Sequence, residues 1–136
     1  MKNILWIFTF LLCLLIGTSY AQAQDITELD KNESEAKLLK NPKDLVANFI
    51  VGAYYYNKAT EIEKEIAKAS FSSYIEAGKN KLEELRAMLK KALPYLENAY
   101  FASNKSEPKI AEALEDIYFH LGMKKKPEDV NGFNSF

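Results

Sequence analysis

The chain has 136 residues, and its 18 basic and 19 acidic side chains leave a formal net charge of -1. This near balance argues against nucleic acid as a partner, since phosphate binding rests on clustered Lys and Arg, and we expect none. A single cysteine, Cys13, and a single histidine, His120, also exclude an internal disulfide and any zinc motif built on two histidines.

Residues 1–23 have the layout of a secretory signal peptide. Lys2 gives a positive start, residues 4–17 form an apolar run, and small residues precede a cleavage site after Ala23. An uncleaved membrane anchor is the alternative, although the run is shorter than the ~20 residues that a spanning helix needs. We therefore predict an exported protein, periplasmic or secreted, with no membrane span after cleavage. Cleavage would also remove Cys13.

The segment 24–42 is mostly charged, and its apolar cluster consists of Ala36, Leu38 and Leu39. One interpretation is a short helix over residues 33–40, which ends before Pro42 because the residue preceding a proline avoids the helical region. The other interpretation is a solvated tail.

A long amphipathic helix is predicted from Asp44, which can cap its N-terminus. On one face, residues that suit contact with a partner helix recur at alternating steps of three and four: Leu45, Asn48, Gly52, Tyr55, Ala59, Ile62, Ile66 and Ala69. A second apolar stripe lies beside the first half of this helix: Val46, Phe49, Ile50, Ala53 and Tyr56. A helix that is apolar on two sides either lies between neighbours or exposes a binding surface.

A second helix is predicted from Lys79, after a break over residues 71–78 where small residues weaken the helical pattern. Its apolar residues show the same spacing: Leu82, Leu85, Leu89, Ala92, Leu96 and Ala99. We expect the two helices to form an antiparallel hairpin. Pro94 cannot donate to the carbonyl of Lys90, so we expect a kink there.

A third helix is predicted with Ser106 as its cap, Pro108 in its first turn and Gly122 at its end. Its apolar residues form one stripe: Ile110, Ala113, Leu114, Ile117, Tyr118 and Leu121. Residues 124–136 are expected to form a flexible tail, with a helical turn over residues 127–130.

Four motifs along the chain share features of one known repeat. These are Val51-Gly52-x-x-Tyr55, the set Ala92, Leu96 and Ala99, the pair Leu114-x-x-x-Tyr118, and residues 38–44, read LLKNPKD. They resemble, in that order, the first helix, the second helix, the following first helix and the closing turn of the tetratricopeptide repeat (TPR). That repeat is a helical hairpin of about 34 residues that stacks into a superhelix.

The resemblance implies an all-α fold over residues 43–123, a TPR-like antiparallel hairpin with elongated helices plus a third helix. Residues 24–42 would be a partial repeat, and the sequence is similar to the C-terminal part of secreted bacterial TPR proteins. It departs from the family in roughly twenty extra residues, 60–81, and in the missing proline at Asn104. The last repeat also lacks a convincing second helix. One full and two partial repeats are fewer than the three that usually bury a continuous core.

The resemblance further implies a non-enzymatic protein–protein interaction module of the bacterial cell envelope, which binds a partner segment in a concave groove. Tyr55 would lie between the hairpin helices, Tyr54 would face an adjacent helix, and Tyr56 would face the groove. The groove residues would be Val46, Phe49, Tyr56, Asn57, Lys109, Glu112, Asp116, Phe119 and His120. An aromatic floor with a few charges suits a bound peptide. In the alternative interpretation, Tyr56 and Phe119 cover loops or the N-terminal segment.

The sequence raises two other functions. The first is a structural protein whose partial repeats complete each other in a homodimer, because Ile110, Leu114 and Ile117 lack a following helix to cover them. The second is an enzyme, which would need an activated nucleophile or a metal. Carboxylate pairs such as Glu112 and Asp116 have ordinary helical spacing. We therefore predict no enzymatic activity, no metal site and no cofactor.

Overall fold

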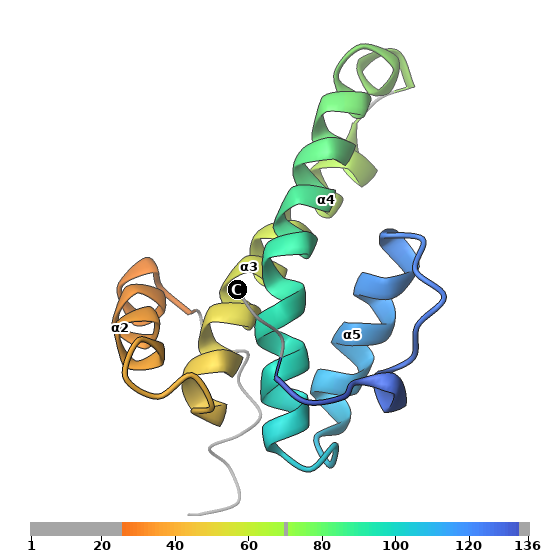
Figure 1. Cartoon of the computed structure of the whole chain (residues 1–136). Helices are drawn as coiled ribbons and strands as arrows, with labels where there is room; N and C mark the ends of the chain where they lie inside the picture. Colours follow the sequence, from red (N-terminus) through yellow and green to blue (C-terminus); the bar gives the residue numbers. More distant parts are fainter. Residues whose placement is uncertain (1–25, 70, 134–136) are drawn as a thin grey trace, which may run out of the picture.

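Figure 1 shows the computed structural model of the chain, which describes residues 26–69 and 71–133, with the backbone alone for residues 71–77. Within these ranges the fold is all-α, as predicted, with no strand. The elements are α2 (Glu28–Leu38), α3 (Leu45–Lys68), α4 (Phe71–Ala102), α5 (Pro108–His120) and a 3-10 helix, η1 (Pro127–Asp129). The predicted signal peptide, with Cys13, lies outside the described residues.

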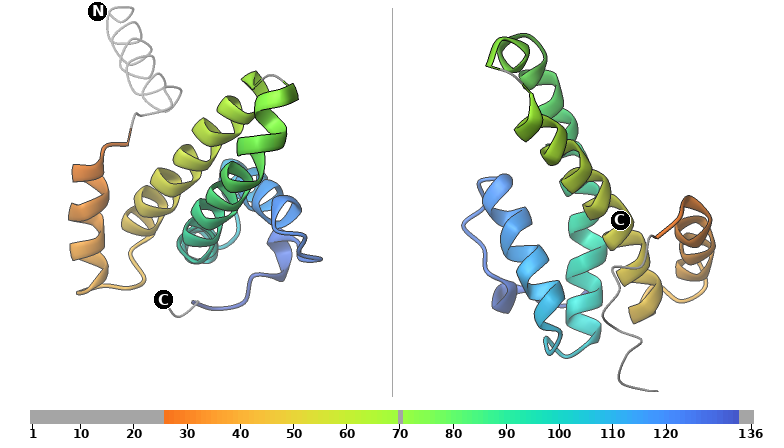
Figure 2. Two further views of the ribbon diagram at one scale, coloured as in Figure 1. Left: turned by 90° about the horizontal axis from the view of Figure 1, so that it is seen from above. Right: turned by 180° about the vertical axis from the view of Figure 1, so that it is seen from behind.

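The centre of the fold is the hairpin of α3 and α4, which run antiparallel to each other (Figure 1). Helix α2 packs against α3 on one side of the hairpin, and α5 packs against α4 on the other. The views from above and from behind in Figure 2 show the same order. The hairpin extends beyond both flanking helices, as the extra residues 60–81 led us to expect.

Helix α2 starts earlier than the predicted 33–40, because Thr27 and Asp30 form a capping box. The Thr27 hydroxyl accepts from the Asp30 amide at 3.2 Å, and the Asp30 carboxylate accepts from the Thr27 amide at 2.9 Å. Leu38 is buried against α3, whereas Leu39 is 88% exposed. The solvated-tail interpretation of this segment is therefore wrong.

Helix α3 begins as predicted, with the Asp44 carboxylate accepting from the Ala47 amide at 2.8 Å. One turn further on, the side chain of Asn48 is fully buried. Its amide nitrogen donates to the carbonyls of Pro42 and Asp44, at 2.9 and 2.8 Å. Asn48 therefore anchors the turn between α2 and α3, because its side chain provides a hydrogen-bond donor to the Pro42 carbonyl and a second donor, beside the Asn48 backbone amide, to the Asp44 carbonyl.

Gly52 allows α3 and α4 to approach each other closely. A Cβ atom built on Gly52 would lie 2.7 Å from Cγ of Leu96 and 3.1 Å from the backbone nitrogen of Leu96. The first of these distances is shorter than packed carbon atoms tolerate. A side chain at this position would push the two helices apart.

The predicted break over residues 71–78 is wrong, because α3 ends at Lys68 and α4 already begins at Phe71. One glycine inside a helix costs only about 1 kcal/mol relative to alanine, so Gly78 does not end the helix. Helix α4 also continues through Pro94. The expected kink there stays a prediction.

Helix α5 begins one residue later than expected, because Glu107 and not Ser106 occupies the N-cap. The Ser106 hydroxyl instead donates to the carbonyl of Ser103, at 2.6 Å. Pro108 is the first helical residue and needs no amide hydrogen there. At the other end Gly122 takes a φ of 66°, the left-handed conformation that favours glycine after a helix.

The segment after α5 differs from the expected flexible tail. Its helical turn is present as η1, but Pro127 and Val130 are buried, and Val130 belongs to the main core cluster. The ring of Phe133 packs edge-on against Phe101 of α4, with centroids 5.4 Å apart. This segment supplies apolar cover that the sequence pattern assigned to no element.

The apolar stripe of α5, for which the sequence offers no following helix, is buried by contacts within the chain itself. Ile110, Leu114, Ile117 and Tyr118 all lie in the core cluster that contains α4 residues and Val130. The buried carboxylate of Glu97 on α4 accepts from the Tyr118 hydroxyl at 2.7 Å and pairs with Lys125. Burial and Glu97 together raise the pKa of Tyr118. The homodimer was predicted because this stripe was expected to be exposed, and that reason no longer holds.

Candidate partner-binding face

The nine residues predicted to line a groove lie on two helices, Val46, Phe49, Tyr56 and Asn57 on α3 and Lys109, Glu112, Asp116, Phe119 and His120 on α5. We call them the α3–α5 face. Three of them meet directly. The Tyr56 hydroxyl donates to Asp116 at 3.0 Å, and Nε2 of His120 lies 3.4 Å from Oδ1 of Asp116.

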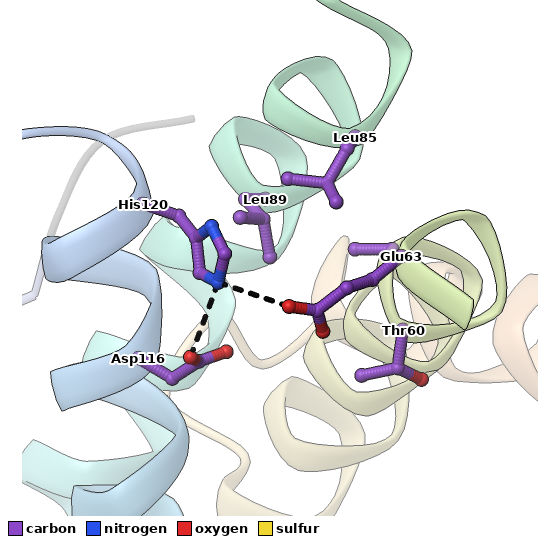
Figure 3. A pocket seen from close by; sticks show the side chains of 7 residues that line it. Thr60, Glu63, Leu85, Leu89, Asp116 and His120 are labelled. Carbon is purple, nitrogen blue, oxygen red and sulfur yellow. Dashed lines mark ion pairs between the residues drawn. The ribbon is translucent and has the colours of Figure 1, made fainter. Parts of the chain in front are cut away.

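Figure 3 shows how His120 joins the two helices: its ring points toward Asp116 on its own helix and toward Glu63 on α3. Nε2 of His120 lies 3.5 Å from Oε1 of Glu63. Because Tyr56 contacts Asp116 and Glu63 contacts His120, α3 and α5 run in the same direction along this face. Leu85 and Leu89 of α4 form the apolar floor beneath the contact (Figure 3).

The indentation between these side chains does not admit even a water molecule. The contact of Tyr56, Glu63, Asp116 and His120 is therefore a bridge that fixes α5 against the hairpin, and it holds no small-molecule cavity. Any ligand of this region must bind on the face itself.

Carboxylates dominate the electrostatic environment of Tyr56. Its pKa is raised to about 12, first by partial burial and then by the negative charges of Asp116, Glu63 and Glu112. Each carboxylate disfavours the tyrosinate anion, since like charges repel. The middle of the α3–α5 face is therefore acidic.

The remaining residues of the face are open to solvent. Val46 is 60% exposed, Phe49 39% and Phe119 80%. Asn57, Lys109 and Glu112 are exposed as well. At this exposure Phe119 covers no loop, so that alternative interpretation is wrong for Phe119. For Tyr56 the outcome is intermediate, because its hydroxyl binds Asp116 while its ring is half-buried.

Sequence reasoning missed Glu63, which the structure places beside His120. A signal was available, because Glu63 follows Tyr56 by two helical turns and thus shares its side of α3. Its partner on α5 could not be inferred, since that contact depends on how the helices pack.

Tyr54, Tyr55 and Tyr56 are consecutive in the sequence. Tyr54 and Tyr55 lie away from the α3–α5 face. Tyr55 packs between α3 and α4, as predicted, and stacks on Tyr95 with ring centroids 6.5 Å apart. Tyr54 lies edge-on to Tyr55 at 5.4 Å. Both border an open depression of about 350 Å³, lined also by Lys58, Glu61, Ile62, Glu65, Glu84 and Met88.

In the part of the chain that the structure describes, no three His, Cys, Asp or Glu side chains are placed to hold a metal ion. Within the same residues, no helix has both the length and the apolar character that crossing a bilayer requires.

Comparison with known proteins gives no relative. The sequence matches no family model and no curated protein, and no solved structure matches the chain. The resemblance to TPR proteins therefore stays a prediction from the sequence motifs.

Proposed function

We propose that the chain is a non-enzymatic protein–protein interaction module that binds a partner segment on its α3–α5 face. The observation that carries this proposal is the exposure of Val46, Phe49 and Phe119 on that face. Burying one large apolar side chain contributes about 1.5–3 kcal/mol, so a partner that covers these three would gain affinity from each.

The packing of the bridge supports the same proposal. The Tyr56–Asp116 and Glu63–His120 contacts connect the two helices that carry the exposed apolar side chains. A surface on two helices held in register needs little rearrangement before it binds, which lowers the entropic cost of association.

We also propose a TPR-like arrangement of the elements. In it α2 is the second helix of an incomplete repeat, α3 and α4 form one elongated repeat, and α5 is the first helix of the next. The tight contact of Gly52 with Leu96 supports this, because the glycine belongs to the motif Val51-Gly52-x-x-Tyr55. With the signal-peptide layout of residues 1–23, the module would act in the periplasm or outside the cell.

The test compares capture of proteins from cell-envelope extract by three forms of the purified protein. These are the wild type, a variant with Val46→Ser, Phe49→Ser and Phe119→Ser, and a control with Leu29→Ser and Leu39→Ser. The control changes side chains of α2 that are 66% and 88% exposed, so it should fold normally, and circular dichroism checks the fold of both variants.

We expect the wild type and the α2 control to capture the same proteins, and the triple variant to lose them. Mass spectrometry quantifies each captured protein. Identical proteins in equal amounts from all three forms would refute the proposed function.

A further inference from the structure

We infer that the partner segment of the α3–α5 face carries a lysine or arginine side chain, with an apolar side chain on each side of it. This inference rests on the proposed function and adds the chemistry of the partner. It follows from the charges and from the order of residues along the face.

The accessible charges in the middle of the face are carboxylates. The side chains of Glu63 and Asp116 are 51% and 38% exposed, although both contact His120. Glu112 is exposed and precedes Asp116 by one helical turn, so it lies on the same side of α5. A cation between these residues would interact with more than one carboxylate.

The cation-forming side chains near these three carboxylates do not neutralise their negative charge. His120 is the cation-forming side chain seen in contact with Glu63 and Asp116, and α4 contributes the apolar Leu85 and Leu89. Lys109 lies two turns before Asp116, about 10 Å along α5, but only one turn before Glu112 on the same side of the helix. His120 and Lys109 together supply at most two positive charges against the three carboxylates, so the middle of the face stays net negative toward an incoming basic side chain.

The apolar side chains are placed at both ends of the acidic part. Phe49 precedes Tyr56 by two turns, about 10 Å along α3, and Val46 lies one turn before Phe49. An extended segment advances about 3.3 Å per residue, so its basic side chain should follow its first apolar side chain by about three residues. Phe119, one turn after Asp116, offers contact to a second apolar side chain on the far side.

An acidic segment or a terminal carboxylate fits this face poorly. Either would place a negative charge near Glu63, Glu112 and Asp116, and such like-charge contacts act against binding. Charge complementarity thus selects a basic partner segment over an acidic one.

The test measures binding of three fluorescent twelve-residue peptides to the purified protein by fluorescence anisotropy. Each peptide has a leucine three residues before its central position and a phenylalanine two residues after it. The central residue is arginine, glutamine or glutamate. We expect the arginine peptide to bind about three- to tenfold more tightly than the glutamine peptide, and the glutamate peptide to bind most weakly. High salt should reduce these differences.

Two charge-reversed variants make the test specific. Glu112→Lys should abolish or reverse the preference for arginine. Glu33→Lys makes the same change of charge at an exposed position of α2, on the opposite side of the hairpin, and should leave the preference intact. Circular dichroism checks that both variants fold.

Equal affinity for the three peptides, lost in the triple serine variant of the face, would overturn this inference and leave the proposed function standing. Preference for glutamate would overturn it as well. If none of the three peptides binds, the inference also fails, and the capture experiment then decides the proposed function separately.

Discussion

At the scale of single residues, Gly52 determines how closely α3 and α4 pack. Alanine normally favours a helix over glycine by about 0.5–1 kcal/mol. At Gly52 the added methyl group would lie 2.7 Å from Leu96 Cγ, and such overpacking usually costs about 1–3 kcal/mol. We therefore expect Gly52→Ala to lower the free energy of unfolding, measured by urea denaturation.

The matched control is Asn57→Ala, at an exposed position of the same helix, where no neighbour is displaced. It should stabilise the protein slightly, since alanine is the better helix former. If Gly52→Ala also proved more stable than the wild type, the close approach of the helices would be wrong.

Tyr56 should make stability depend on alkaline pH. Its folded pKa is raised from 10.0 to about 12, so the folded state holds the phenolic proton more tightly than the unfolded state. The stabilisation is complete below a pH of about 10 and is lost as the pH rises through about 12. In Tyr56→Phe the free energy of unfolding should therefore fall less steeply with pH. Urea denaturation between about pH 8 and about pH 11 measures both slopes, and equal slopes would contradict this role.

Local signals in the sequence predicted the roles of several residues correctly. They could not predict contacts between helices that are distant in the sequence. The cap at Asp44, the left-handed Gly122 and the core position of Tyr55 follow from local chemistry and spacing. The pairing of Glu63 with His120 depends on the packing of α5 beside α3. Neither the sequence of α3 nor that of α5 alone indicates such a pair.

At the scale of elements, the extension of the hairpin should contribute less stability than its base. Ile66 lies in the extension and is half-buried, whereas Leu89 is almost fully buried in the core cluster. We expect Leu89→Ala to cost about 2–5 kcal/mol and Ile66→Ala roughly half as much, because fewer contacts are lost. Chemical denaturation of the two variants and the wild type provides the comparison.

An unchanged midpoint for Ile66→Ala would mean that the extension contributes no stability. A cost as large as that of Leu89→Ala would mean that Ile66 is more deeply packed than described. Either result would contradict the graded burial along the hairpin.

The element boundaries show where periodicity was sufficient and where it failed. The long apolar stripes predicted the α3 and α4 hairpin and the position of α5. The start of α2 was missed because the prediction relied on apolar residues and overlooked the Thr27 and Asp30 capping box. The start of α4 at Phe71 is earlier than predicted, because the small residues after it weaken the helical pattern but cost little within a long helix.

At the scale of the whole molecule, the segment 124–133 covers the open end of the fold. Deletion of residues 124–136 would remove the buried Val130 from the core cluster that it shares with Leu114 and Tyr118, and would remove Lys125 from its contact with the buried Glu97. Removing one partner of a buried carboxylate is destabilising, and newly exposed apolar surface promotes association. We expect the truncated protein to be less stable and to self-associate.

Light scattering across micromolar concentrations should find the intact protein monomeric and the truncated protein in larger species. A dimer formed equally by both would contradict the role of the C-terminal segment. It would instead support the homodimer considered from the sequence.

The all-α class of the fold could be predicted from the sequence. The packing of the C-terminal segment on the core could not. The sequence indicated a long hairpin and a third helix after it, with a short helix before it as one of two interpretations, and the structure confirms the helices. That Val130 enters the core could not be read from a short, mostly polar segment, because one buried valine leaves no periodic pattern.

The central claim is that the α3–α5 face binds a partner, and site-specific photo-crosslinking in the cells that produce the protein tests it most directly. A photoreactive phenylalanine analogue is placed singly at Phe49 or Phe119 on the face, and at Leu29 or Leu39 on α2 as controls. All four side chains are exposed, so each reports on what lies against it. We predict that the two positions on the face give a covalent adduct with the same partner and that the two on α2 do not. Adducts from the α2 positions alone, or from none of the four, would contradict the claim.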